Sequence, residues 1–151
     1  MNDAPSFGQN RAFWAALVAW LFAQSLKMIA RYRKTGRVDF AVLVSTGGMP
    51  SAHAAMVCAL ATAIGLEAGF GTPVFALALA FAGIVMFDAQ SVRRAAGQQA
   101  RLLNQIVEEL FQQHHLSEQK LAELLGHTRT EVFMGMLTGI AVALLLRRLA
   151  G

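Results

Sequence analysis

Four long apolar segments in a chain of 151 residues most constrain the fold. Each comes near the ~20 residues that a helix needs to cross the hydrocarbon core of a bilayer. In a soluble bundle they would leave too little polar surface, and charged residues make up only 15% of the chain against about a quarter in a typical soluble domain. We therefore predict an all-α integral membrane bundle of about four transmembrane helices, forming a single domain over residues 1–151. The segments run from about Ala12 to Ile29, Ser51 to Leu66, Pro73 to Phe87 and Val132 to Leu146.

The stretch between the third and fourth apolar segments, residues 93 to 127, is polar but periodic. Its apolar residues recur at helical spacing, which predicts an amphipathic helical segment that packs on the bundle or lies in the membrane interface. A second short helix is expected from Glu118 to Leu125, between Ser117 as its N-cap and Gly126 as its stop. The periodic apolar residues are Leu102, Leu103, Ile106, Val107, Leu110 and Phe111.

Charge and cysteine content argue against several classes of function. The net charge is +4, and the basic residues neither form one long run nor alternate with aromatic residues, so nucleic acid is not an expected partner. The single cysteine, Cys58, cannot form an internal disulfide, and no Cys/His spacing suits a metal. We expect Cys58 to be a packing residue, and we expect no metal and no other cofactor. The sequence leaves open whether the chain forms a homo-oligomer.

Polar residues from four separate stretches converge when the four segments are threaded through a bilayer. The first segment exits on the side where the second enters, and the third exits where the fourth enters. Ionisable groups beside membrane-embedded segments are costly and usually functional. The residues that this threading gathers at one membrane face are Lys27, Ser51, His53, Arg93, Arg94, His127 and Glu131.

This set of side chains suits phosphoryl transfer without a metal. Lysine and arginine can neutralise the phosphate oxygens in the transition state, and a glycine-rich helix start at Ser51 offers backbone N–H groups to an anion. One histidine can attack phosphorus while the other protonates the leaving oxygen. Glu131 lies four residues after His127, so the two share a helix face and the carboxylate can hold the tautomer of the ring.

Three segments carry a resemblance to a known family: Ser45–His53, Ile84–Gly97 and Leu125–Val132. Together they resemble the divergent type 2 phosphatidic acid phosphatase family, which is related to acid phosphatases and vanadium-dependent haloperoxidases. The resemblance implies His127 as nucleophile, Glu131 as its orienting carboxylate and His53 as general acid. It also implies a lipid phosphate substrate, such as phosphatidylglycerophosphate, phosphatidic acid or a polyprenyl diphosphate. The residues expected to bind the phosphate are Lys27, Gly48, Ser51, Arg93 and Arg94, with Asp88 in support.

Three departures from the wider superfamily keep other functions open. No Arg-Pro pair follows Lys27 at the expected spacing, Ala52 stands where the superfamily has glycine, and the gap between Arg94 and His127 is far longer than five residues. A non-catalytic lipid-binding or assembly protein is therefore the first alternative. A vanadate-dependent haloperoxidase-like enzyme is the second, because the same cradle of side chains fits vanadate.

Several of these residues also have purely structural interpretations. Thr128 and Glu131 form the pattern of a capping box, and we expect that one rotamer of Glu131 cannot serve both the cap and His127. His53 can form a hydrogen bond inside the bundle, and Ser51 can be no more than a helix-start residue. Arg93 and Arg94 can be anchors at the membrane interface, and we expect this role for one of them.

The distribution of basic residues predicts the orientation. Of the 13 lysines and arginines, Arg11, Arg147 and Arg148 lie on the side of the N-terminus and the other ten on the opposite side. The positive-inside rule then makes the face that carries the candidate site cytoplasmic. The expected location is the plasma membrane, taken as a bacterial inner membrane.

Overall fold

The helical elements follow the apolar segments of the sequence. The computed structural model describes residues 6–37, 48–111 and 127–150, and the regular structure in these ranges is entirely helical. The elements long and apolar enough to cross a membrane include α1 (Arg11–Thr35), α5 (Arg129–Ala150) and the stretch Pro73–Val107, which begins with α3. Helix α2 (Ala52–Ala68) is apolar as well, but it has 17 residues and is about 26 Å long. The predicted all-α membrane bundle is confirmed. The elements are η1 (Phe7–Gln9), α1 (Arg11–Thr35), α2 (Ala52–Ala68), α3 (Pro73–Gln90), α4 (Val92–Phe111) and α5 (Arg129–Ala150).

Side-chain caps fix where the helices begin. Asn10 Oδ1 accepts a hydrogen bond from the N–H of Phe13 at 2.9 Å, and Ser51 Oγ accepts from the N–H of Ala54 at 3.4 Å. Thr72 caps α3, which has a proline at its first position, where the missing N–H costs nothing. Ser51 therefore begins α2, as the sequence predicts.

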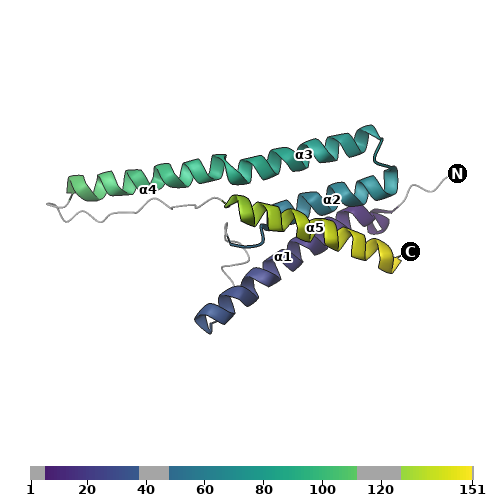
Figure 1. Ribbon diagram of the computed structural model, residues 1–151, viewed down its shortest axis with the longest axis horizontal. Helices are drawn as coiled ribbons and strands as arrows, with labels where there is room; N and C mark the ends of the chain where they lie inside the picture. The colour runs from purple at the N-terminus through teal and green to yellow at the C-terminus, as the bar shows by residue number, and fades with distance from the viewer. Residues whose placement is uncertain (1–5, 38–47, 112–126, 151) are drawn as a thin grey trace.

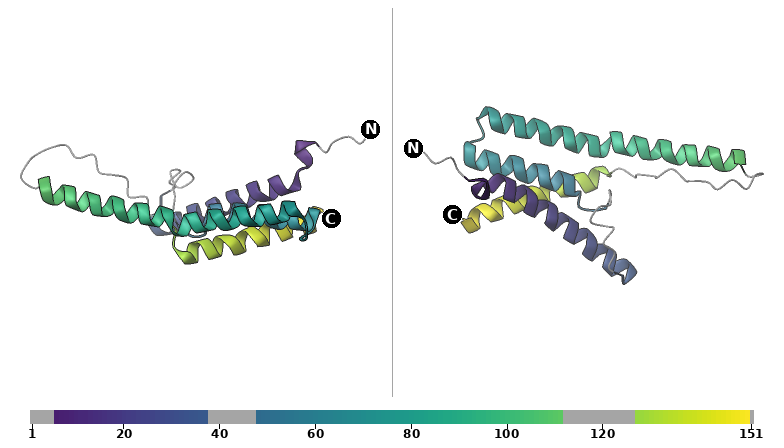
Figure 2. Two further views of the ribbon diagram at one scale, coloured as in Figure 1. Left: turned by 90° about the horizontal axis from the view of Figure 1, so that it is seen from above. Right: turned by 180° about the vertical axis from the view of Figure 1, so that it is seen from behind.

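Helix α2 lies at the centre of the bundle and packs against α1, α3 and α5 (Figure 1). The further views agree that α1 and α5 flank α2 on the side away from α3 (Figure 2). Because these helices alternate in direction, one end of the bundle collects the second half of α1, the start of α2, the end of α3 and the start of α5.

Small residues fill the interior and large apolar residues cover the outside. The main core cluster is built almost wholly of alanine from α1 and α2, with Ala15, Ala19 and Ala23 facing Ala55 and Ala59. Leu77, Ile84 and Phe87 on α3 are instead about two-thirds exposed. Lipid tails give no hydrophobic drive for helices to associate, so membrane bundles pack through small residues and leave large ones for lipid. Cys58 is buried, as expected of a packing residue.

Two glycines let α5 touch the backbone of α2. A Cβ atom added at Gly135 would lie less than 3.0 Å from the carbonyl oxygen of Ser51, and one at Gly139 would lie less than 3.0 Å from that of Ala55. Real Cβ atoms do not come so close. The spacing Gly-x-x-x-Gly is a recurrent motif for close helix contact in membranes. This contact sets the position of the start of α5 against the start of α2.

The segment after α3 departs from what the sequence predicts. The third span was expected to end near Asp88, but α3 continues to Gln90, and α4 follows after Ser91 in nearly the same direction (Figures 1 and 2). No glycine or proline interrupts the chain there, so nothing forces a bend. Within the described residues, α4 contacts chiefly α3, and Leu102, Leu103 and Ile106 are exposed. Packing of α4 on the bundle is therefore not observed, and the helix expected at Glu118–Leu125 lies outside the described residues.

Candidate functional site

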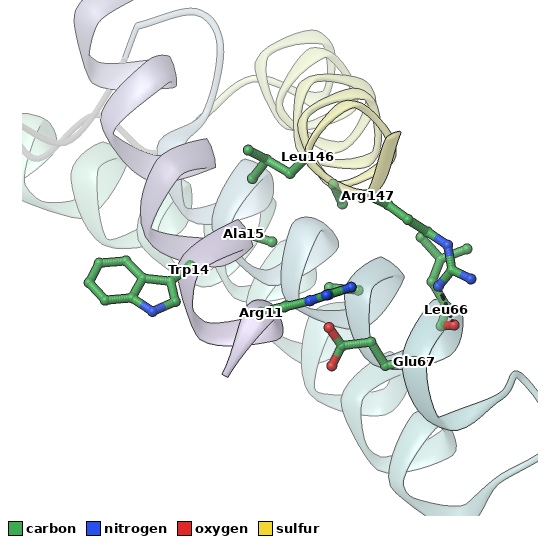
Figure 3. Close-up of a pocket in the computed structure, with 9 residues that line it drawn as sticks. Arg11, Trp14, Ala15, Leu66, Glu67, Leu146 and Arg147 are labelled. Atoms are coloured by element: carbon green, nitrogen blue, oxygen red, sulfur yellow. Dashed lines mark hydrogen bonds between the residues drawn. The ribbon is translucent and has the colours of Figure 1, made fainter. Parts of the chain in front are cut away.

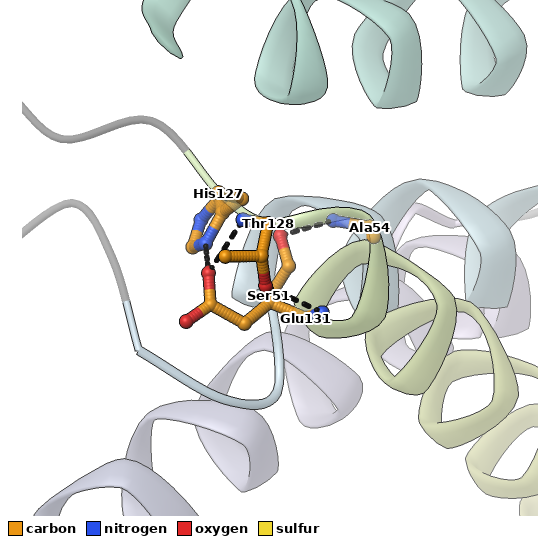
Figure 4. A network of polar contacts seen from close by, with 5 residues as sticks. All are labelled: Ser51, Ala54, His127, Thr128 and Glu131. Carbon is orange, nitrogen blue, oxygen red and sulfur yellow. Dashed lines mark hydrogen bonds and ion pairs between the residues drawn. The ribbon is translucent and has the colours of Figure 1, made fainter. Parts of the chain in front are cut away.

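His127 and Glu131 form the centre of the candidate site at the start of α5 (Figure 4). His127 Nδ1 lies 3.1 Å from Glu131 Oε2, and the histidine is buried, with 2% of its surface exposed. His127 lies two residues before α5 begins at Arg129, so the expectation that the two side chains share a helix face is wrong. Glu131 is in the first turn of α5 and reaches back to the ring. With Nδ1–H donating to the carboxylate, the lone pair of the neutral ring is on Nε2, which faces away from Glu131.

The same carboxylate oxygen also caps α5. Glu131 Oε2 accepts a hydrogen bond from the N–H of Thr128 at 2.9 Å, and Thr128 Oγ1 accepts from the N–H of Glu131 at 3.3 Å (Figure 4). The expectation that one rotamer cannot serve both the cap and His127 is wrong. A carboxylate oxygen has two lone pairs, so Oε2 can accept from the Thr128 backbone and from the His127 ring together.

His53 is the second histidine of the site. Its ring centroid lies 6.3 Å from that of His127, with an angle of 61° between the ring planes. His53 is on the first turn of α2, and His127 is held beside it because its backbone N–H donates to the carbonyl oxygen of Ala89 at the end of α3. Three chain segments therefore fix the distance between the two rings.

Lys27 enters the site from α1. Only 5% of its surface is exposed, and it interacts electrostatically with the carboxylate of Glu131. The aliphatic stem of the lysine runs under Gly48, because a Cβ atom there would lie 3.8 Å from Lys27 Cδ. Gly48 has φ +82°, a left-handed conformation that favours glycine. The structure thus brings Lys27 and Gly48 to the same place as Glu131.

Ser51 links the start of α2 to the start of α5. Its backbone N–H donates to the carbonyl oxygen of Glu131 at 2.9 Å, and its side chain is fully buried as the cap of α2. The structure therefore gives Ser51 the helix-start role that the sequence left open. Binding of phosphate by its hydroxyl stays a prediction.

The remaining predicted site residues, Asp88, Arg93 and Arg94, lie on α3 and α4. Asp88 lies beside Ala89 near the end of α3, in the turn of helix that holds the backbone of His127. Arg93 and Arg94 lie in the first turn of α4, beyond the end of α3, and their side chains are outside what the structure describes. Their expected contact with phosphate stays a prediction.

The local electrostatics favour a bound anion. The N-termini of α2 and α5 both lie at this end of the bundle, and each helix N-terminus carries roughly half a positive charge. Lys27 is the basic side chain that the structure places here, and it interacts with the acidic side chain of Glu131. Among residues 6–37, 48–111 and 127–150, no group of three or more His, Cys, Asp or Glu side chains is placed to hold a metal ion.

The sequence prediction missed two features that build the site. The carbonyl oxygen of Ala89 holds the backbone of His127, and no sequence signal reveals a backbone acceptor of this kind. Gly135 and Gly139 bring α5 against α2, and here a signal existed, since the four-residue spacing of two glycines in an apolar segment predicts close packing.

Comparisons with known proteins agree with these observations. Residues 8–142 match the model of a family described as the divergent PAP2 family. The chain is 41% identical over 148 residues to the uncharacterized membrane protein YuiD of Bacillus subtilis (strain 168), an alignment that covers 91% of this chain and 94% of that protein. No solved structure matches the chain.

Proposed function

Because the chain belongs to the divergent PAP2 family, we propose that it hydrolyses a phosphate monoester or diphosphate of a membrane lipid through a phosphohistidine intermediate. The observation that carries this proposal is the buried His127 held by Glu131, with the ring of His53 beside it. A nucleophile, its orienting group and a second acid–base residue are the parts that covalent phosphoryl transfer needs.

In the first step, His127 Nε2 attacks the phosphorus atom. A P–N bond forms as the P–O bond to the leaving group breaks, and His53 gives its proton to the departing oxygen. Glu131 accepts from Nδ1–H throughout, so it stabilises the positive charge that the ring gains. Lys27 and the N-termini of α2 and α5 offset the charge on the phosphoryl oxygens.

In the second step, water attacks the phosphohistidine. Neutral His53 takes a proton from this water as the new P–O bond forms, and the P–N bond breaks to release inorganic phosphate. The proton on His53 then restores the acid for the next cycle. Substrates consistent with this chemistry are phosphatidylglycerophosphate, phosphatidic acid and polyprenyl diphosphates.

We further propose that the site faces the cytoplasm. The end of α1 on the same side as His127 carries Arg33 and Lys34 in its last turn, and the threading of the sequence assigns ten of the 13 lysines and arginines to this side. Cytoplasmic loops of membrane proteins carry an excess of such residues.

Release of inorganic phosphate by the detergent-purified chain tests the function. The three lipid classes are each supplied in mixed micelles, with and without EDTA. We expect release from at least one class, at a rate that the chelator does not change. Protein that is folded by circular dichroism yet releases phosphate from none of them would refute the enzyme and favour the lipid-binding or assembly role. Halide oxidation that requires added vanadate would instead identify the haloperoxidase-like alternative.

A pair of variants separates the two contacts of Glu131. Glu131→Gln keeps a side-chain oxygen for the cap but loses the negative charge, so we expect the rate to fall roughly 10²-fold or more. Thr128→Val removes the capping hydroxyl and keeps the backbone N–H, so we expect a loss of ~1 kcal/mol in stability with little change in rate. Equal rates of phosphate release in Glu131→Gln and in the unmodified protein would show that Glu131 acts only as a capping residue.

A further inference from the structure

A cavity, shown in Figure 3, lies at the end of the bundle where α1 begins and α5 ends, away from His127. It has a volume of about 190 Å³ and lies between α1, α2 and α5. Its walls are apolar, formed chiefly by Trp14, Ala63, Ala143 and Leu146. A cavity of ~150 Å³ with such walls already admits a benzene molecule, so this one is large enough for part of an acyl chain.

The mouth of the cavity is charged. Arg11 and Arg147 lie at its rim together with Glu67 (Figure 3). An open groove adjoins the cavity, shares these three residues and adds Arg148. The groove thus carries three guanidinium groups against one carboxylate, and we call it the arginine groove. It suits an anion, while the cavity beside it suits a hydrocarbon chain.

The arginine groove contains every lysine and arginine that the threading assigns to this end of the bundle. Arginines that only anchor helices in the interface would be distributed around the bundle, whereas Arg11, Arg147 and Arg148 come from opposite ends of the chain to line one groove. Arg147 also donates a hydrogen bond to the carbonyl oxygen of Leu66, which holds its guanidinium beside the mouth (Figure 3).

We propose that the cavity and the arginine groove bind one anionic phospholipid. An acyl chain enters the cavity beside Trp14 and Leu146, and the headgroup phosphate contacts Arg11 and Arg148. Planar guanidinium groups bind phosphate oxygens through paired, charge-assisted hydrogen bonds. This site is separate from the two histidines, so it stands whether or not the chain is a phosphatase.

Native mass spectrometry of the detergent-solubilised full chain tests the proposal. Equimolar phosphatidylglycerol and phosphatidylcholine with the same acyl chains are offered together. We expect several-fold more bound phosphatidylglycerol, and we expect Arg11→Gln and Arg148→Gln each to lower its retention about fivefold, the factor that one cation near a membrane surface contributes. Arg33→Gln is the matched control, because Arg33 is an exposed arginine at the other end of α1. It should leave retention unchanged.

Two further arms use the unmodified protein, so the test does not depend on any variant folding. Inorganic phosphate and glycerol phosphate, each in excess, should fail to displace the phospholipid because they lack an acyl chain. Displacement by either would identify a site for a free phosphate and overturn the proposal. Equal retention of the two phospholipids, or equal losses in Arg11→Gln and Arg33→Gln, would overturn it as well.

Discussion

Alanine in place of His127 is expected to lower phosphate release ~10³-fold or more, because loss of a nucleophile removes the covalent route altogether. The side chain is buried and held in place by Glu131. The variant should also fail to form an acid-labile, base-stable phosphoenzyme when it is mixed with radiolabelled substrate. The measurement is the rate of phosphate release, followed by gel analysis of the labelled protein.

His53→Ala should behave differently because a general acid matters less when the leaving group needs no proton. With a lipid phosphate the expected loss is ~10²–10⁴-fold, and with an aryl phosphate of low leaving-group pKa it should shrink markedly. The loss in His127→Ala should be the same for both substrates. His53→Ala should therefore still form the phosphoenzyme from the aryl phosphate.

Thr62→Val provides the control for both histidine variants. Thr62 lies more than two turns from His53 on α2, and its hydroxyl donates to the carbonyl oxygen of Cys58. This change removes a polar atom from the bundle without touching the site. A labelled phosphoenzyme in His127→Ala, or equal sensitivity of the two histidine variants to the leaving group, would contradict the proposed roles.

Alanine at Gly139 is expected to destabilise the bundle although alanine is the better helix former. The new Cβ atom would overlap the backbone of Ala55, which cannot move aside as a side chain can. Overpacking of this kind costs about 1–3 kcal/mol, so the apparent Tm in detergent should fall by roughly 5 °C. Gly135→Ala should also shift the start of α5, since its Cβ atom would meet the carbonyl oxygen of Ser51. Circular dichroism during heating provides the measurement.

Gly83→Ala is the matched control for this prediction. Gly83 is also a glycine within an apolar helix, but in the described part of the chain no atom of another element lies within 4 Å of the position that its Cβ atom would occupy. Alanine there should leave the Tm unchanged or raise it, since alanine favours a helix by about 1 kcal/mol over glycine. The close packing of α2 and α5 would be refuted if Gly139→Ala and Gly83→Ala melted at the same temperature.

Local signals in the sequence predict the helices well. Four apolar segments, a serine at the start of α2 and the Thr128–Glu131 pair each depend on residues within a few positions of one another, and the structure has all of them. The course of α4 could not be predicted in this way. Its direction depends on whether the backbone bends at Ser91, and an amphipathic pattern alone does not distinguish a straight continuation from a packed helix.

The sequence predicts which end of the bundle the site residues share, because helix topology determines that, but it does not predict how close together they lie. Alternating helix directions bring Lys27, His53 and His127 to one end of the bundle, but they say nothing about distances. The 6.3 Å between the two rings results from contacts of α5 with the backbone of α2 and of His127 with Ala89. The bond between His127 and Ala89 joins main-chain atoms, which every residue has, so side-chain types do not reveal it. The spacing of Gly135 and Gly139 predicts a close helix contact but does not say which helix is the partner.

The length of α2 has a consequence for the membrane around it. At about 26 Å it falls short of a hydrocarbon core of ~30 Å, while the 25 residues of α1 exceed it. Because α2 is packed among longer helices, its start is recessed from the end of α1, which continues from Lys27 at the site to Thr35. A thinner bilayer would bring lipid headgroups closer to His53. Bilayer thickness would then act as a control on access to the site, with short-chain lipids giving the easiest approach.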